Sequence, residues 1–327
     1  ARRSRTHHES LHGLKTELRR LGLHTVCESA RCPNIHECFH RGAATFLILG
    51  DTCTRSCGFC AVPRGRPLEL DPAEPAQVAR MAASMGLRYV VITSVNRDEL
   101  ADGGSGHWAR TVREVKRALP QARVEVLTPD FCGDLEAVAR VLEAAPDVFN
   151  HNVETVPRLY RRVRPQADYR QSLGVLEFAR RCAPAVLTKS GFMVGLGERV
   201  EEVQELLRDL RAAGVEVVTI GQYLQPTRRQ LPVAEYMEPE VFERYRRFGL
   251  ELGFRAVFSG PLVRSSYHAA DQARRRDVDH RQVGIHAMHA VQAGQRQVAA
   301  LHDFMRAVFG DMGGQHHPHL ARAGDQI

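Results

Sequence analysis

Short apolar segments alternate with longer amphipathic segments through most of this chain. The short segments are rich in β-branched and aromatic residues, which predicts buried strands. The longer segments repeat apolar residues three and four positions apart, which predicts helices. The predicted strands are residues 45–49, 89–93, 124–127, 148–153, 186–193 and 215–223, and the predicted helices are 74–85, 106–118, 135–144, 172–182 and 200–213.

Alternating strands and helices predict an α/β fold with a parallel sheet, because right-handed crossovers connect parallel neighbours. Asp134 stands where a helix N-cap is expected, and Gly214 where a helix should end. Six units favour an open, partial (β/α)6 barrel of the TIM type over a closed eightfold one. A further strand at 255–259 would extend or close it.

The two ends of the chain differ from this central part. Apolar residues at helical spacing predict one amphipathic helix over 11–21. After Asp271 an arginine run and many histidines precede one or two predicted amphipathic helices; histidines at such irregular intervals are more typical of solvated side chains than of a metal site. We therefore divide the chain into an N-terminal extension (1–44), a barrel (45–271) and a histidine-rich C-terminal helical tail (272–327).

Composition is that of a soluble globular protein, with 43% hydrophobic and 25% charged residues. No apolar run approaches membrane-spanning length and no secretory signal is visible, so no membrane association is expected. Free, clustered cysteines indicate a reducing compartment, and we expect a cytoplasmic protein.

The net charge of +7 raises nucleic acid as a partner. However, the basic residues are almost all dispersed arginines, and few aromatic residues alternate with them for base stacking. Nucleic-acid binding is therefore not expected. A basic surface would also suit an acidic protein partner.

Six of the eight cysteines lie between Cys27 and Cys60, in two triplets. The first is spaced C-x4-C-x5-C (Cys27, Cys32, Cys38) and the second C-x3-C-x2-C (Cys53, Cys57, Cys60). Three thiolates on a tight loop suit an iron–sulfur cluster, since soft sulfur ligands match iron. A disulfide framework is disfavoured because no apolar signal segment precedes the cysteines and the chain is long enough to need no staples. Structural zinc is disfavoured because only Cys57 and Cys60 have the C-x2-C spacing. Buried, inert thiols account for the isolated Cys132 and Cys182.

The second triplet, with Phe59 before its last cysteine, resembles the signature of radical S-adenosylmethionine (radical SAM) enzymes. Together with the first triplet and the segment RSSYHA at 264–269, it resembles the lipoyl synthase family over residues 11–271. The resemblance implies two [4Fe-4S] clusters. One on Cys53, Cys57 and Cys60 would leave an iron open for S-adenosyl-L-methionine. The other, on Cys27, Cys32, Cys38 and Ser265, would be the sulfur source, with Ser266 as the alternative serine.

The implied reaction is a sulfurtransferase step that inserts two sulfur atoms into carbons 6 and 8 of a protein-bound octanoyl-lysine. The implied partners are an octanoylated lipoyl carrier protein (a lipoyl domain or glycine-cleavage H protein) and a low-potential electron donor such as ferredoxin or flavodoxin. The sequence leaves open the oligomeric state, the donor, the complex that is modified and the role of the tail.

Polar residues at strand ends are the candidate cofactor contacts, because ligands of such barrels bind at the carboxyl ends of the strands. Lys189 and Glu154 are the stronger candidates, since a charge in a buried strand needs a partner or ligand. For the others, capping a strand or bonding a loop is the alternative role. The polar candidates are Ser94, Asn152, Glu154, Lys189 and Gln222, and Phe59 of the cysteine signature is added to them as a cofactor contact.

Three other functions remain possible from the sequence. A different radical SAM enzyme, either biotin-synthase-like or methylthio-transferring, would share the second triplet. An enzyme that generates a protein radical would need only one cluster. A zinc-binding nucleic-acid module is the alternative that is not an enzyme.

Overall fold

The computed structural model describes residues 16, 18–26, 43–266 and 269–272. Cys27, Cys32 and Cys38 lie outside the described residues, as does the chain after residue 272. The predictions for the first cluster and for the histidine-rich tail therefore stay predictions. Of the predicted helix at 11–21, the described residues 16 and 18–20 are helical.

One eight-stranded sheet forms the centre of the described chain, with its strands in sequence order from β1 to β8. β1 pairs antiparallel with β2, and every later neighbour pairs in parallel. The strands are β1 His24–Thr25, β2 Ala43–Ile48, β3 Tyr89–Ser94, β4 Arg123–Leu127, β5 Val148–Asn150, β6 Leu187–Val194, β7 Val217–Gln222 and β8 Ala256–Gly260. Within the described residues the strand order is open, which confirms the partial α/β barrel.

All six predicted strands are present, and the possible strand at 255–259 is β8, which extends the sheet beyond β7. Seven strands are therefore parallel, one more than the predicted six. The shortest of these seven parallel strands is β5, which ends at Asn150 rather than at Val153.

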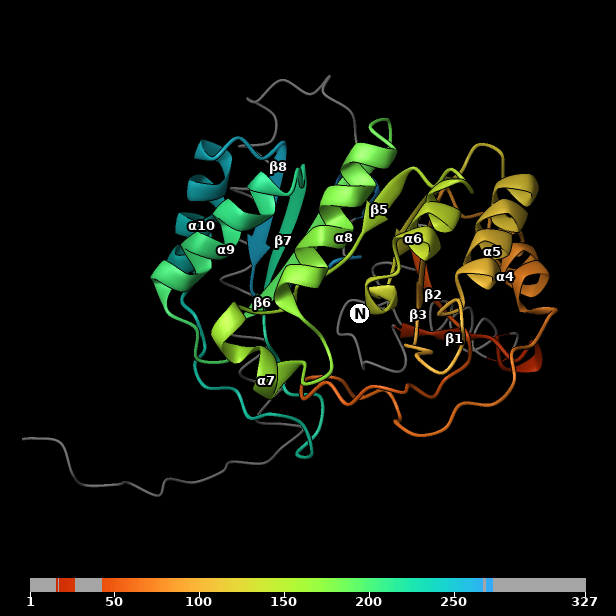
Figure 1. Cartoon of the computed structure of the whole chain (residues 1–327), viewed down its shortest axis with the longest axis horizontal. Helices are drawn as coiled ribbons and strands as arrows, with labels where there is room; N and C mark the ends of the chain where they lie inside the picture. Colours follow the sequence, from red (N-terminus) through yellow and green to blue (C-terminus); the bar gives the residue numbers. More distant parts are fainter. Residues whose placement is uncertain (1–15, 17, 27–42, 267–268, 273–327) are drawn as a thin grey trace, which may run out of the picture. The chain divides into compact units, whose positions relative to one another are not determined.

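Helices connect the parallel strands, and Figure 1 shows α4 and α5 on the right, α6 and α8 in the middle, and α9 and α10 on the left. The described α-helices between residues 74 and 272 are α4 Glu74–Ser84, α5 Ser105–Ala118, α6 Leu135–Leu142, α7 Tyr160–Val163, α8 Tyr169–Cys182, α9 Val200–Ala212, α10 Pro239–Glu251 and α11 Ala269–Gln272. The five predicted helices correspond to α4, α5, α6, α8 and α9, whereas α10 was not predicted.

Two local signals act as expected. The Asp134 carboxylate accepts hydrogen bonds from the main-chain N–H groups of Glu136 and Ala137 at 2.9 and 3.2 Å, and so caps α6. Gly214 has φ +83°, a left-handed conformation that ends α9 at little cost only for glycine.

Alternate residues of β3 face two different cores. On one side, Val90 and Ile92 of β3 belong to the core that packs against α4, α5 and α6. On the other side, Tyr89 and Val91 belong to a small inner core with residues from β5, β6, β7 and α11. We call this second side the inner face. None of the described helices is long and apolar enough to cross a membrane.

Candidate functional site

The second cysteine triplet lies in a loop that begins directly after β2, which we call the cluster loop (residues 51–65). Leu49 and Gly50 turn the chain there with φ angles of +67° and +91°. The loop then folds back on itself, because the N–H of Cys53 donates to the carbonyl of Pro63 at 2.8 Å and that of Gly65 donates to Cys53 at 3.0 Å. The triplet is therefore presented at the carboxyl end of the sheet, as predicted.

The three thiols of the cluster loop, Cys53, Cys57 and Cys60, are free and half-buried. Main-chain N–H groups of Arg55 and Asn96 point at the Cys53 sulfur, 3.4 and 3.3 Å away. Such donors to cysteine sulfur are typical of iron–sulfur sites. This donor set fits an iron–sulfur cluster.

Burial raises the pKa of Cys57 to about 12 and that of Cys60 to about 11. A metal must therefore displace a proton from each thiol, because the thiolate is the ligand. Among the described residues, no three His, Cys, Asp or Glu side chains are arranged around a single ion position. Thiolates that bind different corners of one cluster do not need to converge in this way.

Arg55, between the first two cysteines, anchors the loop to the loops that follow β3 and β4. Its guanidinium donates to the carboxylates of Asp98 and Asp130, at distances from 2.7 to 3.0 Å. Burial disfavours the charge of Arg55, but the hydrogen bonds and charges of the two aspartates outweigh it and raise its pKa. The sequence analysis missed this residue, although an arginine inside a cysteine triplet is a visible signal.

The far side of the cluster loop is held by α7 and by the loop that follows β7. The N–H of Gly58 donates to the carbonyl of Val163 at 2.8 Å, and the N–H of Leu231 donates to Gly58 at 2.9 Å. The Gln230 amide donates to the carbonyl of Cys60 at 3.2 Å. The loop that carries the triplet is thus fixed from several strand ends at once.

Asn152 and Glu154 follow β5 and lie together with Ser265. The Asn152 amide donates to the Glu154 carboxylate at 3.1 Å and to the Ser265 hydroxyl at 2.8 Å, and the hydroxyl donates back to Asn152 Oδ1 at 3.0 Å. Burial raises the pKa of Glu154, against the opposing charge of Arg164 and the Asn152 hydrogen bond. For Ser266, the other candidate of the RSSY segment, the main-chain carbonyl accepts a hydrogen bond from the N–H of Ala269 at 3.3 Å.

Lys189 has a protein partner that the sequence did not identify. Its Nζ lies 2.7 Å from the Glu125 carboxylate, and both side chains are 1% exposed. The same Nζ donates to the main-chain carbonyl of Ser265 at 2.6 Å. Burial lowers the pKa of Lys189, against the charge and hydrogen bond of Glu125. Asn152, Glu154, Lys189 and Ser265 are thus brought together on the inner face.

The other three predicted contacts lie elsewhere. Ser94 falls by alternation on the side of Val90 and Ile92, and within the described chain its buried hydroxyl has no hydrogen-bond partner. The Gln222 amide bonds the main chain of Glu235 and Met237 at 3.0 Å each, and so orders the loop after β7. Phe59 packs against the core that includes α9 and α10.

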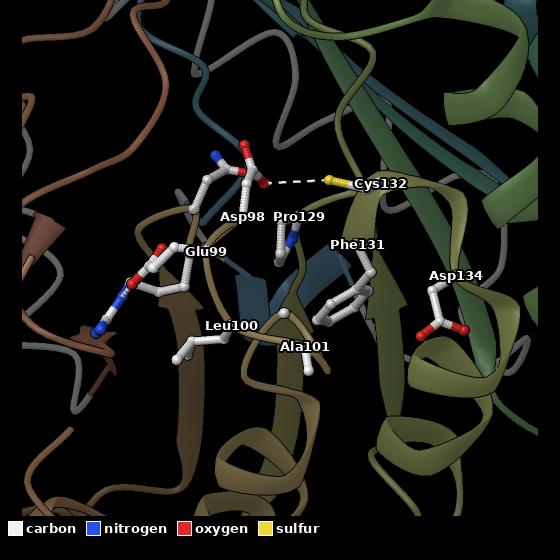
Figure 2. Close-up of a pocket in the computed structure, with 11 residues that line it drawn as sticks. Asp98, Glu99, Leu100, Ala101, Pro129, Phe131, Cys132 and Asp134 are labelled. Carbon is white, nitrogen blue, oxygen red and sulfur yellow. Dashed lines mark hydrogen bonds and ion pairs between the residues drawn. The ribbon is translucent and has the colours of Figure 1, made fainter. Parts of the chain in front are cut away.

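A hollow of about 400 Å³ lies between the loops that follow β3 and β4. Figure 2 shows the Cys132 thiol at this hollow, pointing toward Asp98, to which it donates at 3.4 Å. The interpretation of Cys132 and Cys182 as buried thiols is wrong, because both are exposed. Cys132 stands in the 3₁₀ turn Phe131–Gly133 with φ +53°, and Cys182 is the last residue of α8.

Comparisons with known proteins agree with this geometry. A family model described as the Radical SAM superfamily matches residues 47–210, the part that carries the second triplet and most of the sheet. Lipoyl synthase of Rubrobacter xylanophilus is 61% identical over 259 residues, which cover 79% of this chain and 81% of that protein. This chain belongs to the lipoyl synthase family. Lipoyl synthases of Caldanaerobacter subterraneus and Thermus thermophilus are 56% and 58% identical and cover 80% and 78% of the chain.

Solved structures support the fold of this lipoyl synthase family member. Methylornithine synthase covers 81% of the chain and 88% of its own length, with a TM-score of 0.50 at 16% identity. The FeFe-hydrogenase maturase HydG from Carboxydothermus hydrogenoformans covers 71% of the chain and 56% of its own length, with a TM-score of 0.53 at 16% identity. Membership of the radical SAM superfamily implies one [4Fe-4S] cluster and S-adenosylmethionine as cofactors.

Proposed function

We propose that this enzyme inserts two sulfur atoms at carbons 6 and 8 of an octanoyl-lysine on a lipoyl carrier protein. A first [4Fe-4S] cluster would bind to Cys53, Cys57 and Cys60. A second, on Cys27, Cys32, Cys38 and Ser265, would be the sulfur-donating substrate. The observation that supports this most is that Ser265, far along the chain, lies beside Asn152 near the carboxyl end of the sheet.

When bound, the first cluster and S-adenosylmethionine supply a radical that removes hydrogen from an unactivated alkyl carbon, which side-chain acids and bases cannot do. The protein residues have the tasks of binding and orientation. The N–H groups of Arg55 and Asn96 would stabilise the Cys53 thiolate. Glu154 is near enough to the cluster loop for its charge to act on Cys57 and Cys60. Glu154 and Asn152, which share one hydrogen bond, are the proposed polar contacts for S-adenosylmethionine.

The proposed ligand role of Ser265 is supported by its chemistry and position. A serine oxygen is a harder ligand than a thiolate and a poorer match for iron, so this corner of the cluster would be released more readily than the others. A cluster that donates sulfur has to come apart, and a weakly held corner suits that use. In this structure the hydroxyl already has Asn152 as an alternative partner.

We further propose the division of the chain into residues 1–44, which would carry the second cluster motif, 45–271 and 272–327. The proposed partners are an octanoylated lipoyl domain or glycine-cleavage H protein, and a low-potential donor such as ferredoxin or flavodoxin. The proposed location is the cytoplasm.

The deciding experiment is mass spectrometry of an octanoylated carrier protein after anaerobic turnover with S-adenosylmethionine and a reductant. We expect the octanoyl chain to gain two sulfur atoms and to form a cyclic disulfide after oxidation. Gain of a methylthio group would instead assign the chain to a different radical SAM reaction. Iron analysis of the reconstituted protein should give about eight irons per chain, and about four would contradict the second cluster.

A further inference from the structure

The segment that carries Ser265 crosses the inner face over two glycines that lie within the neighbouring strands β6 and β7. A Cβ atom on Gly221 of β7 would lie 2.3 Å from the carbonyl oxygen of Val263. A Cβ atom on Gly191 of β6 would lie 3.0 Å from the hydroxyl of Ser265 and 2.4 Å from that of Thr219. Glycine within a strand often marks a site where another backbone approaches closely. Here that backbone is the segment 263–265.

The buried pair of Lys189 and Glu125 also contacts the segment 263–265. Lys189 donates to the Ser265 carbonyl at 2.6 Å and to Glu125 at 2.7 Å. Glu125 in turn accepts hydrogen bonds from the Tyr89 hydroxyl at 2.7 Å and the Asn150 amide at 2.9 Å. Two charges this deeply buried are costly unless their hydrogen-bonding groups are satisfied. In this network, one of the donors of the Lys189 ammonium group is used on the main chain of Ser265.

These contacts leave the hydroxyl of Ser265 free of the charge pair. Lys189 donates to the carbonyl oxygen, whereas the hydroxyl exchanges hydrogen bonds with the neutral amide of Asn152 in the described part of the chain. The main chain at Ser265 is therefore fixed by a charge-assisted hydrogen bond from Lys189. The Ser265 hydroxyl can exchange hydrogen-bond partners while the main chain stays in place.

We infer that Glu125, Lys189, Gly191 and Gly221 form a positioning device, the Ser265 anchor, that fixes the main chain at Ser265 so that its hydroxyl can bind and release the second cluster. This inference rests on the proposed ligand role of Ser265. It assigns Lys189 to the positioning of the second cluster rather than to contact with S-adenosylmethionine.

The test compares two variants that disturb the Ser265 anchor from different strands. Lys189→Met removes the ammonium group and keeps most of the side-chain length. Gly221→Ala places a methyl group against the Val263 carbonyl. Gly174→Ala is the matched control, because nothing lies within 4 Å of a Cβ atom at this position in α8. Each full-length chain is reconstituted anaerobically.

For both anchor variants we expect iron to fall from about eight toward about four per chain, while reductive cleavage of S-adenosylmethionine continues. Sulfur insertion should fall at least tenfold. Amide hydrogen exchange gives a readout that needs no cluster: peptides covering 261–266 should exchange at least tenfold faster, and peptides of β2 and β3 should be unchanged. Gly174→Ala should match the unmodified chain in every measurement.

Ser265→Ala separates a failure of this inference from a failure of the proposed function. If Ser265→Ala keeps both clusters and full sulfur insertion, the proposed ligand role is wrong. If Ser265→Ala loses the second cluster but both anchor variants keep it with unchanged exchange at 261–266, the Ser265 anchor is wrong. If Lys189→Met fails to fold, the double variant Glu125→Gln/Lys189→Met is used, because it removes both charges of the pair. The amide of the new glutamine can still bond the Tyr89 hydroxyl and the Asn150 amide. Fast exchange at 261–266 in this double variant supports the anchor, and slow exchange overturns it.

Discussion

The guanidinium of Arg55 donates to both carboxylate oxygens of Asp130, at 2.9 and 2.7 Å, from a position between two of the cluster-loop cysteines. The two side chains are 3% and 0% exposed. Burial alone would raise the pKa of Asp130, but the hydrogen bond and charge of Arg55 outweigh it and lower the pKa to about 2. The loop that carries the triplet is therefore connected to the loop that follows β4 by a buried, bidentate ion pair.

Replacing Asp130 with asparagine should leave Arg55 with a buried charge that only Asp98 compensates. We expect the free energy of unfolding to fall by about 3 kcal/mol, the usual cost of breaking a buried pair by removing one partner. Anaerobic urea unfolding of the reconstituted protein measures this. Asp98→Asn is the matched control, because Asp98 is 31% exposed and its bond to Arg55 is partly solvated. An equal decrease in the free energy of unfolding in both variants would contradict the claim that Asp130 stabilises the loop more than Asp98 does.

A second prediction concerns the contact between the cluster loop and the loop after β7. A Cβ atom on Gly58 would lie 2.8 Å from Leu231 Cδ1 and 3.0 Å from the carbonyl oxygen of Arg162. Gly58→Ala should therefore destabilise the protein by about 1–3 kcal/mol through overpacking. Leu231→Ala removes one of the two obstacles, so the double variant should lose less than the sum of the single losses. Urea unfolding of the four proteins gives this coupling, and strictly additive losses would contradict the clash.

The cysteine triplet and the order of strands and helices could be predicted from the sequence because both are local signals. Ligand spacing on one loop and apolar periodicity within one element need no knowledge of tertiary pairing. The helix α10 belongs to this class and was missed, although Phe242 and Tyr245, which it buries, stand three positions apart.

The partners of the candidate site residues could not be predicted in the same way. The cost of burying Lys189 required a partner or ligand, but Glu125 lies on β4, two strands away, and only the register of β4, β5 and β6 brings them together. The face of the sheet on which Ser94 and Gln222 lie could not be predicted from the sequence either. Strands of a parallel sheet are apolar on both faces, so their sequence does not reveal which residues face inward.

A third prediction separates the cysteines of the cluster loop from the isolated ones. Cys57→Ser should remove the first cluster, lower iron by about four per chain and abolish cleavage of S-adenosylmethionine. Cys132→Ser should leave both unchanged, because the Cys132 thiol bonds to Asp98 and Arg55 rather than to the triplet. Cys182→Ser serves as an exposed control. Iron, sulfide and 5′-deoxyadenosine are measured for each variant, and loss of iron in Cys132→Ser would contradict the assignment.

His151, at the end of β5, should make stability depend on pH. It is 1% exposed and its Nδ1–H donates to the Thr128 carbonyl at 2.9 Å, while within the described chain its buried Nε2 has no partner. Burial, followed by the charge of Arg164, lowers its pKa from 6.5 to about 4, against the charge of Asp130. His151 is therefore protonated below about pH 6.5 in the unfolded chain, but only below about pH 4 in the folded protein.

Between pH 6.5 and pH 4 the unfolded chain binds more protons at His151 than the folded protein does. The free energy of unfolding therefore has its full value above pH 6.5 and falls as the pH is lowered toward 4. Between pH 7.5 and 5.0 the loss from His151 should be about 2 kcal/mol. The contribution of Asp130 is separate, because its pKa is lowered, from 3.8 to about 2, and its stabilisation disappears only below pH 4. His151→Gln keeps a side-chain donor for Thr128 without a titrating group. Anaerobic urea unfolding at both pH values should show the unmodified protein losing about 2 kcal/mol more than this variant. Equal losses would mean that His151 is protonated in the folded protein at pH 5.0, and the burial argument would then be wrong.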